Sequence, residues 1–106
     1  MKGTAMLTKH QVLAQIQENH DQLRALGVVS LGLFGSCARN DPTAESDVDV
    51  LVEFESGQKT FDNFMRLVFL LEDLLQRPVE VVTAESLSPY LRPYIMNEVE
   101  YVPLAA

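Results

Sequence analysis

The chain has 106 residues, of which 47% are hydrophobic, so it is long enough to bury one modest core and too short for two. We therefore expect one domain over residues 1–106. The net charge is −7, from 15 acidic and 8 basic residues, and it argues against a broad surface for nucleic-acid phosphates, which would need clustered Lys and Arg. We expect no direct binding to nucleic acid.

The cysteine content and the apolar runs indicate the compartment. Cys37 is the single cysteine in the sequence, which excludes an internal disulfide and a cysteine-based metal cluster. The N-terminus, "MKGTAMLTKHQ", has no apolar core of signal-peptide length. The longest uninterrupted apolar run, Leu67–Leu71, is far too short to cross a bilayer. We expect a cytoplasmic protein with no membrane partner.

The first predicted element is a helix from Thr8 to Gly27. Thr8 and Gln11 have the spacing of a capping box, apolar residues recur at helical intervals, and Gly27 is placed to end the helix. A buried strand is predicted next over 28–34, because this run is apolar on both faces. The segment that follows, 35–46, is rich in small and turn-forming residues and predicts a loop with a short helical turn inside it.

The second half of the chain predicts two further strands and two helices. A strand is expected over 47–54, a strongly apolar helix over 60–77 and a third strand over 78–82. The last segment, 86–102, predicts a helix interrupted by two prolines, with an edge strand at its end, from Glu100 to Val102. This order of elements predicts an α+β fold, with a small mixed sheet flanked by helices.

Two aspartates stand at the head of the second predicted strand. Because side chains alternate across a strand, Asp47 and Asp49 point to the same face, while the valines between and after them point to the core. Glu80, in the third strand, is a third member of this group if that strand lies beside the second. Three carboxylates together favour hard cations such as Mg²⁺, and two such ions about 4 Å apart clamp the oxygens of a phosphoryl displacement.

Gly35 and Ser36, upstream of the aspartates, predict a phosphate contact. Gly35 permits close approach of the backbone to a ligand, and Ser36 offers an amide and a hydroxyl to phosphate oxygens. The alternative is that "SDVD" is a turn followed by a strand with a polar outer face. The glycine and serine favour the functional interpretation, because they supply the contact that a phosphate needs opposite a metal site.

The stretch "GSCARNDPTAESDVDVLVEF" resembles the signature of the minimal nucleotidyltransferases, a branch of the DNA polymerase beta-like superfamily. Their pattern is Gly-Ser, ten residues, then Asp-x-Asp, and residues 35–49 fit that spacing without a gap. Asn40 stands where the family commonly has glycine. The third acidic position of the family matches Glu80, within "VEVV". The resemblance covers nearly the whole chain and implies the nucleotidyltransferase fold.

The resemblance also implies roles for these residues. Asp47, Asp49 and Glu80 would form the catalytic and metal-binding group, with two Mg²⁺ ions carrying ATP as the co-substrate, and Glu80 could help to deprotonate the acceptor hydroxyl. Gly35 and Ser36 would hold the β- and γ-phosphates, assisted by Arg39. Catalysis would consist of positioning and charge neutralisation during an in-line attack at the α-phosphorus, with release of pyrophosphate.

The same resemblance implies a partner. Many minimal nucleotidyltransferases are paired with a helical HEPN toxin, and this chain resembles the antitoxins that transfer AMP from ATP to a tyrosine of that toxin. The negative net charge suits a basic partner surface. Two alternatives remain open: an antitoxin that inhibits its partner only by binding, and a transferase that acts on a small molecule or an RNA end.

Overall fold

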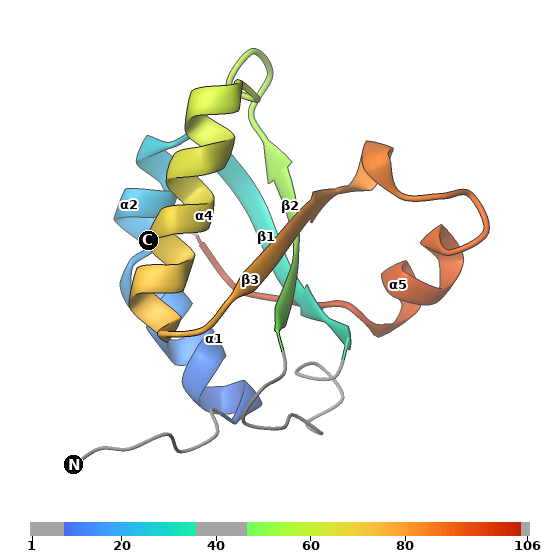
Figure 1. The fold of residues 1–106 in the computed structure, drawn as a ribbon, viewed down its shortest axis with the longest axis horizontal. Helices are drawn as coiled ribbons and strands as arrows, with labels where there is room; N and C mark the ends of the chain where they lie inside the picture. Colours follow the sequence, from blue (N-terminus) through green and yellow to red (C-terminus); the bar gives the residue numbers. More distant parts are fainter. Residues whose placement is uncertain (1–7, 36–46, 105–106) are drawn as a thin grey trace.

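The computed structural model describes residues 8–35 and 47–104. In these ranges the chain forms a four-stranded mixed sheet in the order β3-β2-β1-β4, with helices on both sides (Figure 1). The mixed sheet flanked by helices that the sequence predicts is therefore confirmed. The predicted helical turn around residues 37–39 lies outside the described residues.

The N-terminal helical segment forms two helices, α1 (Lys9–Glu18) and α2 (His20–Ala25). Thr8 caps α1 with the predicted capping box: its hydroxyl accepts a hydrogen bond from the Gln11 amide, and its own amide donates to the Gln11 side chain. The single helix predicted from Thr8 to Gly27 is interrupted at Asn19. The Asn19 side chain donates to the Gln15 carbonyl at 2.8 Å, and its backbone, at φ −112° and ψ 25°, departs from helical geometry.

The centre of the sheet consists of β1 (Val28–Phe34) and β2 (Val48–Phe54), which pair antiparallel. Helix α4 (Phe61–Leu75) then crosses over to β3 (Val79–Thr83), which pairs parallel with β2. A parallel pair needs such a crossover, because a tight turn can join only antiparallel strands. These elements lie within two residues of their predicted bounds.

The C-terminal segment contains a short 3-10 helix, η1 (Ala84–Ser86), then α5 (Arg92–Glu98) and the two-residue strand β4 (Glu100–Tyr101). Helix α5 begins only at Arg92, with Pro93 in its first turn, where proline is tolerated. Strand β4 pairs antiparallel with β1 at the edge of the sheet. The predicted edge strand is thus confirmed.

One hydrophobic core lies between the sheet and the helices α1, α2 and α4, which Figure 1 shows together on one side of the sheet, with α5 on the other. The side chains with no exposed surface in this core are Val12, Ile16, Leu23, Leu31, Leu33, Val50, Leu67 and Leu71. Helix α5 buries no residue. In the parts of the chain that the structure describes, none of the helices has the length and hydrophobicity needed to cross a bilayer.

Candidate active site at the start of strand β2

The two aspartates lie where β2 begins. Asp47 immediately precedes the strand and is exposed, whereas Asp49 is its second residue and is half-buried. Val48 and Val50 are buried on the opposite face, in the core. The core valines thus fix the orientation of the strand, because any slip by one residue would bury the carboxylate of Asp49 and expose the valines.

Glu80 lies directly opposite Asp49 on the neighbouring strand. The parallel register of β2 and β3 pairs these two residues, and the hydrogen bond from the Val48 amide to the Pro78 carbonyl, 3.0 Å, begins this register. Residues paired in this way point to the same face of the sheet, with their backbones about 4.8 Å apart. The sequence placed Glu80 beside the aspartates on the condition that β3 adjoins β2. The structure meets this condition.

Gly35 follows the last residue of β1 and lies against Asp49. Its φ of +76° is in the left-handed region that favours glycine. A Cβ atom added to Gly35 would collide with the carboxylate of Asp49, and would lie 3.2 Å from its Cγ. The antiparallel register explains this proximity, because Phe34 is paired with Asp49. Any other residue at position 35 would displace the carboxylate or strain the backbone.

A fourth carboxylate, that of Glu98, also reaches Gly35. The Gly35 amide donates to Glu98 Oε2 at 2.8 Å, in a partly buried hydrogen bond. Sequence reasoning missed this residue: it placed Glu98 in the last helix, where the structure also has it, but a helical pattern does not indicate what the last residue of a helix contacts. The pairing of the predicted edge strand with the first strand would have located it, since that pairing brings the segment before Glu100 to the end of β1.

The remaining predicted site residues, Ser36 and Arg39, lie outside the described residues. Among residues 8–35 and 47–104, no three His, Cys, Asp or Glu side chains are grouped closely enough to hold a metal ion. The carboxylates present are nevertheless the oxygen ligands that Mg²⁺ takes, with no nitrogen or sulfur ligand beside Asp49 in the paired strands. The donor set at the start of β2 therefore fits a hard cation better than a transition metal.

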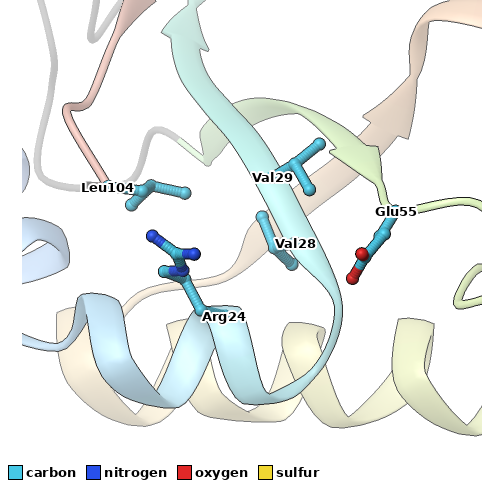
Figure 2. A pocket seen from close by; sticks show the side chains of 5 residues that line it. All are labelled: Arg24, Val28, Val29, Glu55 and Leu104. Carbon is cyan, nitrogen blue, oxygen red and sulfur yellow. The ribbon is translucent and has the colours of Figure 1, made fainter. Parts of the chain in front are cut away.

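A separate pocket lies at the other end of β1 (Figure 2). It has a volume of about 410 Å³ and is lined by Arg24, Val28, Val29, Glu55 and Leu104. Since β1 begins at Val28 and Gly35 follows its last residue, the length of the strand separates this pocket from the carboxylates. The pocket contains none of the residues that the sequence predicts for the site.

Comparison with known proteins identifies the family. Residues 13–102 match the family model described as nucleotidyltransferase domain. The chain belongs to this family. The protein adenylyltransferase MntA of Thermococcus cleftensis is 35% identical to this nucleotidyltransferase over 99 residues, which cover 92% of this chain and 99% of the relative. A Methanocaldococcus jannaschii protein, described as a candidate protein adenylyltransferase, is 43% identical over 72 residues, covering 68% of this chain and 76% of the relative.

Solved structures agree with this assignment. A structure described as a candidate minimal nucleotidyltransferase superposes with a TM-score of 0.79 at 31% identity, covering 91% of this chain and 97% of that chain. A toxin–antitoxin structure with AMP-PNP shares the fold at a TM-score of 0.62 and 21% identity, covering 92% of this chain and 73% of that chain. The family and the nucleotidyltransferase fold that the motif predicts are both confirmed.

Proposed function

We propose that this nucleotidyltransferase is a Mg²⁺-dependent protein adenylyltransferase and an antitoxin. It transfers AMP from ATP to a hydroxyl group, that of a tyrosine, on a partner HEPN toxin. The observation that carries the proposal is the arrangement of Gly35, Asp49 and Glu80. Three neighbouring chain segments bring together a backbone that a ligand can approach closely and two paired carboxylates.

In this proposal each site residue has a defined task. Asp47 and Asp49 hold the metal ions, and Ser36 contacts the phosphates, assisted by Arg39. The acceptor oxygen forms a bond to the α-phosphorus, while the bond from that phosphorus to pyrophosphate breaks. Glu80 takes the proton of the acceptor hydroxyl. Its exposed side chain favours this role, because the acceptor arrives from solvent.

Mg²⁺, when bound, neutralises charge on the phosphates and stabilises the attacking and leaving oxygens. The chain's own residues explain why such a cation is needed. Asp49 and Glu80 are adjacent carboxylates on one face of the sheet, and a triphosphate adds several more negative charges beside them. Without a cation, like-charge repulsion would oppose binding of the nucleotide.

The relatives support a protein as the acceptor. The Thermococcus cleftensis relative, which this chain covers almost completely, is named as a protein adenylyltransferase. Structures of the same fold were solved as toxin–antitoxin assemblies, one of them with an ATP analogue. In this chain, large apolar side chains are exposed around α5, which suits contact with a protein more than with a small hydrophilic acceptor. They are Tyr90, Leu91, Tyr94, Met96 and Tyr101.

The second candidate function is inhibition of the partner by binding alone. The same exposed residues around α5 favour it, because they would bury apolar surface against a partner without any chemistry. Transfer to a small molecule or an RNA end is a weaker alternative, because the net charge of −7 opposes binding of an RNA acceptor.

The test is to incubate the protein with α-labelled ATP, Mg²⁺ and the HEPN toxin proposed as its partner. Wild type is expected to label the toxin, and the double variant Asp47→Asn/Asp49→Asn is expected to lose labelling by at least about a thousandfold, since it removes the metal ligands. Mass spectrometry of the product then locates the added AMP on tyrosine. Glu53→Gln is the matched control, because Glu53 is an exposed acid on the same strand and face as Asp49.

The outcomes separate the two functions. If the double variant no longer labels the toxin but still neutralises it fully in cells, neutralisation is by binding, and AMP transfer does not account for it. If wild type labels an added small molecule or RNA and leaves the toxin unlabelled, the acceptor is wrong while the chemistry stands.

A further inference from the structure

The C-terminal segment runs antiparallel beside the end of β1 and reaches the candidate site. Gly32 is paired with Tyr101, and Leu33 with Glu100. Just before this pair, Glu98 is the last residue of α5, and it meets Gly35 beyond the end of β1. The hydrogen bond from the Gly35 amide to Glu98 Oε2, 2.8 Å, links the two positions, which are 63 residues apart in the sequence.

The sheet holds this segment in place. A Cβ atom added to Gly32 would lie 2.6 Å from Val99 Cγ2 and 3.2 Å from the Glu100 carbonyl oxygen, so the segment packs directly on the backbone of β1. The Val102 amide donates to the Leu31 carbonyl at 2.8 Å. Since α5 itself buries no residue, the position of Glu98 depends on the residues that follow it, Glu100 and Tyr101, which pair with β1.

We propose that Glu98 is a positioning residue for nucleotide binding, an inference that rests on the proposed function. Its carboxylate holds the peptide group of Gly35, whose φ of +76° keeps the backbone against Asp49. A hydrogen bond from an amide to a charged carboxylate is stronger than one between neutral groups. Glu98 thus holds the Gly35 peptide group beside Asp49, at the end of β1 where the nucleotide is proposed to bind.

This assignment changes the role of Gly35. Its amide donates to Glu98, so the glycine contributes close approach and orientation, and this amide is not the donor to a phosphate. Glu98 acts through Gly35 and does not touch the substrate. Loss of the carboxylate therefore weakens nucleotide binding more than it slows the chemical step.

The test compares Glu98→Ala and Glu98→Gln with wild type and with Asn97→Ala, an exposed neighbour on the same helix that serves as the control. In Glu98→Ala the KM for ATP is expected to rise roughly tenfold with kcat within about twofold, the scale of one charge-assisted hydrogen bond. Glu98→Gln recovers most of the lost affinity for ATP, because its amide oxygen accepts the same bond without the charge. Glu98→Met, similar in length and a poor acceptor, replaces the alanine variant if that variant does not fold.

A second readout follows the hydrogen bond itself. Hydrogen exchange of the Gly35 amide, measured by ¹⁵N NMR, is expected to be at least about tenfold faster in Glu98→Ala than in wild type. It remains near wild type in Glu98→Gln and Asn97→Ala. Equal exchange in Glu98→Ala and wild type would contradict the structural basis of the proposal.

The remaining outcomes distinguish this inference from the proposed function. If wild type binds ATP with Mg²⁺ in calorimetry and Glu98→Ala binds equally well or more tightly, only the role of Glu98 is overturned. A Glu98→Gln variant as impaired as Glu98→Ala also overturns it, because the charge and not the hydrogen bond would then matter. Failure of wild type to bind ATP overturns both.

Discussion

Substitution of Gly35 by alanine tests the geometry of the site most directly. Alanine at position 35 would be held in an unfavourable backbone conformation and would collide with Asp49. The variant Gly57→Ala separates these two effects. Both glycines have positive φ, +76° at Gly35 and +82° at Gly57. A Cβ atom at Gly57 would meet no atom within 4 Å, whereas one at Gly35 would collide with the Asp49 carboxylate. Gly57→Ala therefore reports the cost of the backbone conformation alone.

The expected loss of stability is the sum of the backbone cost and the cost of the collision. Alanine in the left-handed region costs about 1–2 kcal/mol, and this term is common to both variants. A collision in a packed site adds about 1–3 kcal/mol at Gly35, unless the Asp49 carboxylate moves away. In a domain of this size 1 kcal/mol lowers the melting temperature by about 4–8 °C. We expect both variants to melt below wild type, with Gly35→Ala as low as Gly57→Ala or lower.

The activity separates the variants further. Displacement of a catalytic group by about 1 Å costs on the order of a hundredfold in rate, so Gly35→Ala is expected to lose AMP transfer by at least that factor. Gly57→Ala is expected to transfer AMP within about twofold of wild type. The assay is transfer of label from α-labelled ATP at about 15–20 °C, near the temperature at which small domains are most stable. Equal transfer by the two variants would refute the reasoning, because the contact between Gly35 and Asp49 would then have no consequence for function.

Three other predictions concern the core, a helix cap and the metal. Leu71→Ala removes a side chain with no exposed surface and should lower the free energy of unfolding by about 2–5 kcal/mol in urea denaturation, whereas Phe69→Ala, 62% exposed on the same helix, should change it by less than about 0.5 kcal/mol. Thr60→Ala removes the hydroxyl that accepts from the Asn63 amide at 3.1 Å, and should cost about 1 kcal/mol in the same measurement, with Thr60→Ser close to wild type. ATP with Mg²⁺ at about 100 times its Kd should stabilise wild type by about 2.7 kcal/mol in thermal unfolding. Neither EDTA-treated wild type nor Asp49→Asn should show this gain in stability. An equal gain in Asp49→Asn would contradict metal binding by that carboxylate.

Local patterns were sufficient to predict most of the fold. The residues 28–34 form a strand with the bounds that their apolar run indicates, and Thr8 caps the first helix as its spacing with Gln11 predicts. The interruption at Asn19 was not predictable from periodicity. Ile16 and Leu23, seven residues apart, keep the same helical spacing through the break and are both buried, so the apolar pattern is the same with or without it.

The site was predictable to the extent that it depends on neighbouring strands. The crossover through α4 makes β2 and β3 parallel, and this places Glu80 beside Asp49 as the alternation of each strand requires. Glu98 was not predictable in the same way. Its contact with Gly35 depends on which edge of the sheet the last strand joins and in which register, and a two-residue strand carries too little pattern to indicate either.

The charges around Gly35 connect these observations. Asp49 adjoins Gly35 on one side, Glu98 accepts a hydrogen bond from its amide, and Glu80 is paired with Asp49. These carboxylates have different surroundings: Glu80 is exposed, while the Glu98 bond to Gly35 is partly buried. The Glu98 oxygen that accepts the Gly35 amide has a lone pair already occupied by that hydrogen bond. We therefore propose that the metal ions and the acceptor proton lie on the side of Asp49 and Glu80, and that Glu98 holds the backbone of Gly35.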